Sequence, residues 1–223
     1  MDLAKWMEEG GAFMWPILAC GILGAAVAGE RAIQIYARAG VDARAFMAAV
    51  QRALLDGDVD GALRQCNADP DAALPRVIKA GLVRADRPVG EIRSGLEEAQ
   101  AEVLPRISKR LALLPMIANV STLLGLLGTI QGLILSFHSI GEANAEQRST
   151  ALAQGIAVAM YTTYFGLIVA IPIMVAHGLI AGRANAILDD IDHAALKLAN
   201  LLEARRGGGA PADGTPNVVP FRS

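Results

Sequence analysis

The chain has 223 residues, of which 53% are hydrophobic and 19% charged, with a formal net charge of −2. Its mean hydropathy of +0.40 is typical of an integral membrane protein. The small net charge excludes the strongly basic surface by which proteins bind nucleic acid. The two cysteines, Cys20 and Cys66, belong to no C-x-x-C or Cys/His cluster, so neither a disulfide framework nor a zinc site is predicted.

Three runs without Lys, Arg, Asp or Glu are each long enough to cross a bilayer, which takes about 20 residues. They cover residues 10–29, 111–141 and 149–182. The start of the chain lacks the basic residues of a cleavable signal peptide, so we expect an external segment at 1–13 and an uncleaved transmembrane helix at 14–36. Trp15 and Tyr36 suit the two membrane interfaces of that helix.

Residues 37–110 are charged and amphipathic, which predicts a small helical domain. Asp42 caps its first expected helix and Asp56-Gly57 ends it, and short helices are expected near 60–66 and 72–84. A last helix begins after Arg87-Pro88, and no glycine separates it from the second apolar run. We therefore expect one continuous helix of about 50 residues, roughly 75 Å long, with kinks only at Pro105 and Pro115.

The second transmembrane helix, expected over 111–138, carries small and hydroxyl-bearing residues on one face. They recur three and four residues apart within T-L-L-G-L-L-G-T-I-Q-G-L-I-L-S, at Thr122, Gly125, Thr129, Gly132 and Ser136, with Gly128 beside them. Such a face either packs closely against another helix or lines a polar path. The sequence leaves both readings open.

The third transmembrane helix, expected over 149–182, repeats this pattern at Gly155, Ala159, Thr163, Gly166 and Ala170, with Thr162 beside it. Tyr161 and Tyr164 also lie well inside the span, where a phenol either packs against a neighbouring helix or lines a path. Pro172 predicts a kink or a hinge. The helix is expected to continue over 183–206, ahead of a disordered tail rich in Gly and Pro at 207–223.

Basic residues predict the orientation of the chain. Seventeen of the 20 Lys and Arg residues fall in 37–110 or after 182, whereas Lys5 and Arg148 are the two on the other side. By the positive-inside rule the helical domain and the C-terminus are cytoplasmic, and the N-terminus and a link at 139–148 are external.

Other candidate chemistry has weaker support. Asp56, Asp58, Asp60 and Gly61 imitate the start of a calcium-binding EF-hand loop, but Asn67 stands where a glutamate is required. Helix capping explains these acids better. His138, His177 and His193 lack metal-ligand spacing, and no nucleophile–base pair or phosphate loop occurs. We therefore expect neither an enzyme nor a metal or organic cofactor.

Four motifs resemble those of the MotA/TolQ/ExbB proton-channel family over nearly the whole chain. They are L-L-G-L-L-G-T-I-Q-G-L at 123–133, G-I-A-V-A-M-Y-T-T-Y-F-G-L-I-V-A-I-P at 155–172, G-E-R at 29–31 and G-D-V-D-G-A-L at 57–63. The resemblance implies an all-α membrane protein with three spans, the second and third extended into long cytoplasmic helices, in a bacterial inner membrane. It also implies a motor that uses protons as the transported ion, for energised transport across the envelope or for motility.

The resemblance further implies a homopentamer around a one-span partner of the ExbD/TolR/MotB kind, which supplies an intramembrane aspartate. Thr129 and Thr163 match the threonines that face that acid, and Thr122, Ser136, Tyr161 and Thr162 are assigned to the same proton path. Val158 stands where Ton and Tol members usually have a glutamate, which leaves the branch of the family open. A non-conducting membrane scaffold and a subunit of a small-solute transporter are the competing interpretations.

The orientation gives the first testable prediction. A reporter fused after Ser223, or inserted near Asp69, should read as cytoplasmic, because most basic residues flank these positions. Activity of paired cytoplasmic and periplasmic reporters at both positions measures this, and an external signal at either position would overturn the predicted orientation.

Overall fold

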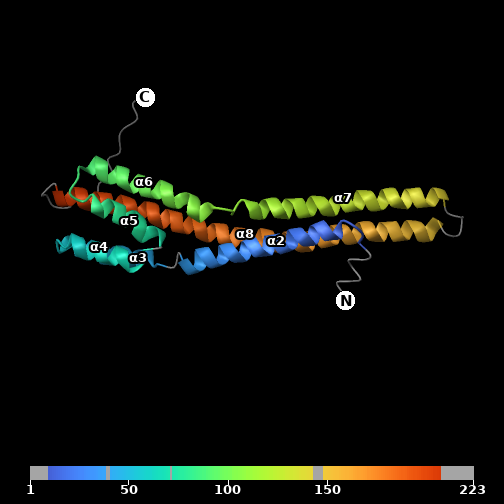
Figure 1. Ribbon diagram of the computed structural model, residues 1–223, viewed down its shortest axis with the longest axis horizontal. Helices are drawn as coiled ribbons and strands as arrows, with labels where there is room; N and C mark the ends of the chain where they lie inside the picture. Colours follow the sequence, from blue (N-terminus) through green and yellow to red (C-terminus); the bar gives the residue numbers. More distant parts are fainter. Residues whose placement is uncertain (1–9, 39–40, 71, 143–147, 207–223) are drawn as a thin grey trace, which may run out of the picture. The chain divides into compact units, whose positions relative to one another are not determined.

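The computed structural model describes residues 10–38, 41–70, 72–142 and 148–206, so most of 1–13, half of the 139–148 link and all of 207–223 lie outside the described residues. Within those ranges every regular element is a helix (Figure 1). The elements are α2 (Met14–Arg38), α3 (Ala43–Leu55), α4 (Val59–Ala68), α5 (Ala73–Val83), α6 (Val89–Ser108), α7 (Leu113–Glu142) and α8 (Arg148–Arg206).

The helices form two compact units. The membrane unit contains α2 and residues 106–186, and the helical unit contains α3 to α5, most of α6 and the end of α8 from Ile187. Three stretches, at Met14–Tyr36, Val89–His138 and Arg148–Arg206, are long and apolar enough to cross a membrane. The predicted all-α fold with three such helices, two of them extended into long helices, is confirmed.

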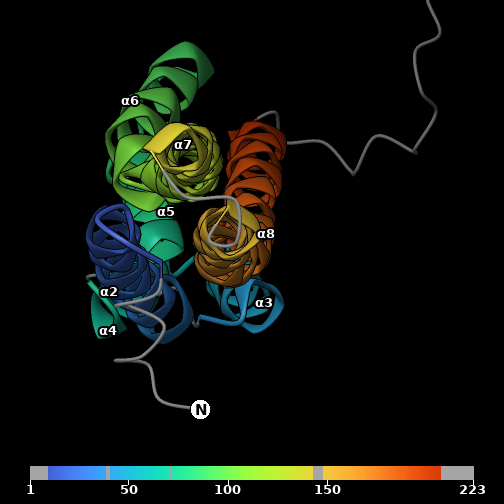
Figure 2. The same ribbon diagram turned by 90° about the vertical axis from the view of Figure 1, so that its right-hand side faces the viewer.

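In the membrane unit, α2, α7 and the first part of α8 lie side by side (Figures 1 and 2). Met14 and Ile17 at the start of α2 are buried and form an apolar cluster with Phe165 of α8, against which Leu124 of α7 also packs. Further along α2, the absence of a side chain at Gly24 lets Ile173 of α8 approach the backbone of α2. Apolar contacts thus hold α2 against both other helices.

The expectation of one continuous helix through residues 88–138 is wrong. Helix α6 ends at Ser108 and α7 begins at Leu113, and Arg110 between them has a φ of +61°. One cause is local, because Pro115 has no N–H to donate to the carbonyl of Leu111. The helix therefore restarts with Pro115 in its first turn, where no intrahelical donor is needed. Pro105, in contrast, lies within α6.

The helical unit follows the sequence pattern closely. The Asp42 carboxylate accepts a hydrogen bond of 2.9 Å from the amide of Arg44 and caps α3, as predicted. Gly57, at φ +80°, ends that segment in the left-handed region that glycine adopts most easily. Asp58 accepts from the amide of Gly61 at 2.7 Å and pairs with Arg64 at 2.9 Å, so this acid acts as a helix cap.

The end of α8 completes the core of the helical unit. Leu198 is fully buried, and it packs with Leu96 of α6 close to the backbone of Gly81 in α5. At the last turn, Arg206 donates to the carbonyl oxygen of Ala85 at 2.9 Å and Arg205 to that of Gly57 at 3.4 Å. A segment more than a hundred residues away in sequence therefore fixes two turns of this unit.

Cys66 on α4 gives a prediction for the helical unit. Burial raises the pKa of its thiol from 9.0 to about 11, partly opposed by nearby Lys79. Since the thiolate is the reactive form, its population at pH 8 falls about a hundredfold relative to an ordinary thiol. Alkylation of Cys66 by iodoacetamide, followed by mass spectrometry in a Cys20→Ser background, should therefore be far slower in folded than in denatured protein. Equal rates would contradict the buried placement.

Candidate functional site

Helices α7 and α8 approach one another so closely that their backbones touch. A Cβ atom added to Gly125 would lie 3.1 Å from the carbonyl oxygen of Thr162 and 3.3 Å from the Cα of Thr163. One added to Gly166 would lie 2.9 Å from the carbonyl oxygen of Ser121. No side chain fits at either glycine without moving a helix.

The contact continues towards the end of α7. A Cβ atom on Gly132 would lie 3.0 Å from the amide nitrogen of Ala159 and 3.1 Å from the carbonyl oxygen of Gly155. One on Gly155 would overlap the Ser136 hydroxyl, and one on Gly128 would come within 2.6 Å of the Thr162 hydroxyl oxygen. Small residues from the two helices therefore face one another over most of the length of the membrane unit.

Three hydroxyl groups cross this contact to a carbonyl oxygen of the facing helix. Ser121 donates to Gly166 at 3.2 Å, Thr163 donates to Gly125 at 3.2 Å, and Ser136 donates to Leu152 at 3.5 Å. Each bond pairs a polar group that would otherwise be costly to bury in a membrane.

The remaining predicted hydroxyls turn back to their own helices. Thr122 donates to Ala118 at 3.1 Å, Thr129 to Leu126 at 2.6 Å, and Thr162 to Ala159 at 2.9 Å. Thr162 is buried at the contact, whereas Thr129 is half-buried and Thr122 is exposed. The predicted face of α7 therefore divides into residues that touch α8 and two threonines on its flank.

The row of α7 that faces α8 consists of Ser121, Gly125, Gly128, Gly132 and Ser136. Sequence reasoning missed Ser121, which is 0% exposed. Its spacing of four residues before Gly125 was the available signal, but Thr122 has almost the same spacing. Only the structure distinguishes these two adjacent positions.

The other predicted residues of α8 lie at or near its contact with α7. We call the two helices joined by this contact the hairpin. Ala159 and Ala170 are buried, Tyr161 is half-buried, and Tyr164 is 53% exposed. Pro172 is exposed and lies within α8, which continues past it to Arg206. Val158 is half-buried, with a methyl carbon 3.8 Å from the position that a Cβ on Gly11 would take.

The chemistry available to the hairpin is limited by its side chains. Residues 111–141 and 149–182 contain no Asp, Glu, Lys or Arg. Threonine, serine and tyrosine both donate and accept hydrogen bonds, so they orient water or a carboxyl group, but they do not gain or lose a proton near neutral pH. These hydroxyl groups are therefore able to hydrogen-bond a carboxyl group but not to relay a proton themselves.

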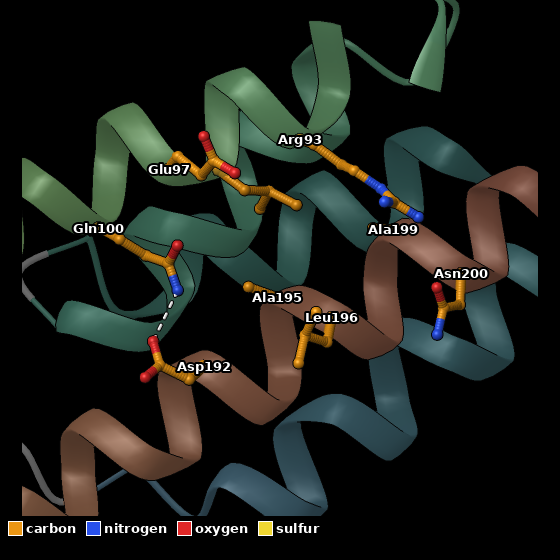
Figure 3. A pocket seen from close by; sticks show the side chains of 9 residues that line it. Arg93, Glu97, Gln100, Asp192, Ala195, Leu196, Ala199 and Asn200 are labelled. Atoms are coloured by element: carbon orange, nitrogen blue, oxygen red, sulfur yellow. Dashed lines mark hydrogen bonds between the residues drawn. The ribbon is translucent and has the colours of Figure 1, made fainter. Parts of the chain in front are cut away.

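A cavity of about 400 Å³ lies within the helical unit between α6 and α8 (Figure 3). Its sides carry Glu97 and Gln100 of α6 and Asp192 and Asn200 of α8, with Leu196 between them. Gln100 donates to Asp192 at 2.8 Å across one end. None of the predicted site residues lines this cavity.

Comparison with known proteins agrees with the sequence motifs. The sequence model described as the MotA/TolQ/ExbB proton channel family matches residues 69–193. A putative biopolymer transport protein ExbB homolog of Methanothermobacter thermautotrophicus is 30% identical over 188 residues, which cover 84% of this chain and 66% of that protein. The biopolymer transport protein exbB1 of Vibrio cholerae is 29% identical, over 86% of this chain and 85% of its own.

A third relative is named for the Tol-Pal system. The Tol-Pal system protein TolQ of Haemophilus influenzae is 30% identical over 149 residues, which cover 67% of this chain and 59% of that protein. The chain thus spans about two thirds of the length of the Methanothermobacter relative and a larger share of the Vibrio protein.

The helix contact yields a prediction with a matched control. Gly166→Ala should force α7 and α8 apart and break the Ser121 bond, lowering stability by roughly 1–3 kcal/mol. Gly178 lies on the same helix with nothing within 4 Å of an added Cβ, so Gly178→Ala should be neutral or slightly stabilising. Thermal unfolding in detergent measures both, and equal melting temperatures would contradict the close packing.

Proposed function

Since this chain belongs to the MotA/TolQ/ExbB proton channel family, we propose that it is a subunit of an inner-membrane complex that uses the proton-motive force to energise biopolymer transport. In this proposal proton flow through the complex is coupled to mechanical work on a load in the cell envelope. The relatives named for biopolymer transport and for the Tol-Pal system support this class of work over motility.

The observation that carries the proposal is the charge-free hairpin of α7 and α8. A proton that crosses the membrane gains about 2.3 kcal/mol per 100 mV, but it needs titratable groups to carry it across the hydrocarbon. The hairpin supplies hydroxyl groups on two closely packed helices, but residues 111–141 and 149–182 contain no Asp or Glu that could carry the proton. A partner with one membrane helix and an intramembrane aspartate, of the ExbD/TolR/MotB kind, completes the path.

We place the partner's aspartate near Thr129 and Thr163. The Thr129 hydroxyl donates to its own helix at 2.6 Å, which leaves the oxygen free to accept a hydrogen bond from a protonated carboxyl group. Because Thr129 lies on the flank of the α7–α8 contact, the packing of this hairpin does not occupy it. We assign Thr122 and Tyr161 to the same path.

The buried hydroxyls have a different place in this mechanism. Ser136 and Thr162 are 2% and 1% exposed, and both donate to backbone carbonyls at the helix contact. Ser136 bonds the facing helix and Thr162 its own helix, so both hydroxyls are occupied at the helix contact beside the path. Several copies of this chain, five in the family arrangement, would surround one partner helix. Each copy would present the same threonines, and the partner's aspartate would contact one copy after another.

Reconstitution separates this function from a non-conducting scaffold. Liposomes that hold the protein with its one-span partner should take up protons under a membrane potential, and liposomes with either protein alone should not. Replacing the partner's aspartate by asparagine should abolish the uptake, since residues 111–141 and 149–182 of this chain contain no carboxylate that could take its place.

The side chain of Thr163 is tested in the same liposomes. Thr163→Val removes the hydroxyl that we place beside the partner's acid and should lower partner-dependent uptake about tenfold or more, the loss expected when that acid loses one hydrogen bond. Thr163→Ser keeps the hydroxyl and should retain most of the uptake. Robust uptake by the protein alone, unaffected by Thr163→Val, would exclude the proposed mechanism.

A further inference from the structure

The break between α6 and α7 has an unusual residue at its centre. Arg110 has a φ of +61° and is the only residue other than glycine with a positive φ in the described part of the chain. Helices commonly end in this left-handed conformation, but they use glycine for it, because a Cβ atom makes it unfavourable. The sequence Ser-Lys-Arg-Leu-Ala at 108–112 offers no glycine. Something besides local preference therefore holds Arg110.

The contact that holds it comes from α2. Nη1 of Arg110 lies 2.8 Å and 3.0 Å from the two carboxylate oxygens of Glu30. Glu30 also accepts a bond of 3.2 Å from the side-chain amide of Gln34, and Gln34 in turn accepts one of 2.8 Å from Arg31. Arg31 extends to the carbonyl oxygen of Arg106 at 3.5 Å. These bonds tie α2 to the chain at residue 106, before the break, and at Arg110 within it.

The burial of Arg31 indicates that the arrangement serves more than stability. Its side chain is 2% exposed, and its Nε atom has no hydrogen-bond partner among the described residues. Burying a guanidinium group with an unpaired donor is unfavourable, so an apolar side chain at this position would give a more stable packing. This unfavourable burial is consistent with a cation placed to bind the last carbonyl groups of α6, because those groups attract positive charge.

We infer that Glu30 and Arg31 form a clamp that keeps the α6–α7 break in its left-handed conformation. Glu30 is a positioning residue, which acts through Arg110 on the backbone. When the clamp opens, Arg110 returns to the right-handed region that it prefers. The clamp thus makes the break a two-state turn ahead of α7.

This inference goes beyond the proposed function. Its test does not use proton flux, so a failure of the clamp and a failure of proton coupling are distinguishable.

Hydrogen exchange at the break tests the clamp. The amides of Leu111, Leu113 and Leu114 donate to carbonyls three residues earlier and report whether the turn is closed. Full-length protein in nanodiscs is compared with Glu30→Gln by mass spectrometry of peptides covering 106–114. Loss of one partly exposed ion pair should speed exchange there by about two- to fivefold. Glu97→Gln, which alters an exposed acid on α6 outside the clamp, is the matched control and should change nothing.

Two substitutions of Arg110 distinguish a clamp on the backbone from a general surface ion pair, since both remove the pair with Glu30. Arg110→Ala keeps a Cβ atom and should speed exchange at 106–114 as Glu30→Gln does, whereas Arg110→Gly should not. Arg110→Gly lets the backbone adopt a positive φ at no steric cost, so the break no longer needs Glu30. Adding Glu30→Gln to Arg110→Gly should therefore leave exchange at 106–114 unchanged. If Glu30→Gln alone fails to fold, the double variant should fold.

Two results would overturn the inference. One is unchanged exchange at the break in Glu30→Gln. The other is an equal effect of Glu30→Gln with and without the Arg110→Gly substitution, including equal failure to fold, which would show that Glu30 acts without reference to the backbone conformation at position 110.

Discussion

The close approach of α7 and α8 is the constraint on which the rest of the membrane unit depends. Between helices in lipid the hydrophobic effect supplies little attraction, so packing and hydrogen bonds must supply it. Gly125 and Gly166 bring the two backbones into contact, and only at that separation do the hydroxyls of Ser121 and Thr163 reach a carbonyl oxygen on the facing helix. The larger apolar side chains of these helices, such as Leu126 and Ile168, lie exposed on the other faces.

The sequence predicted the helical unit more fully than the membrane contact. Burial of Leu74, Val77 and Ile78 follows from amphipathic spacing in a segment with polar residues on its other face. In the spans this contrast is absent, because Leu and Ile cover most faces. Ser121 and Thr122 are adjacent, both fit a stripe of small residues, and their spacing does not tell which one faces α8.

The break at Arg110 was not predictable for a different reason. Pro115 was visible in the sequence, but a proline near a helix start and a proline that only kinks a helix look alike. What selects the break is also distant, since Glu30 lies 80 residues before Arg110. A periodic pattern contains no information on such a contact, and no residue in 108–112 carries the usual glycine signal of a helix end.

The two helical connections that leave the membrane unit differ in continuity. Helix α8 continues without interruption from the hairpin contact to the core of the helical unit, where Leu198 is fully buried and Arg206 binds a carbonyl at 2.9 Å. Helix α7 instead ends at a clamped turn before α6 begins. The chain thus passes between the two units once as an unbroken helix and once through a turn. That turn has no glycine, so the pair of Arg110 with Glu30 of α2 is what stabilises its left-handed residue.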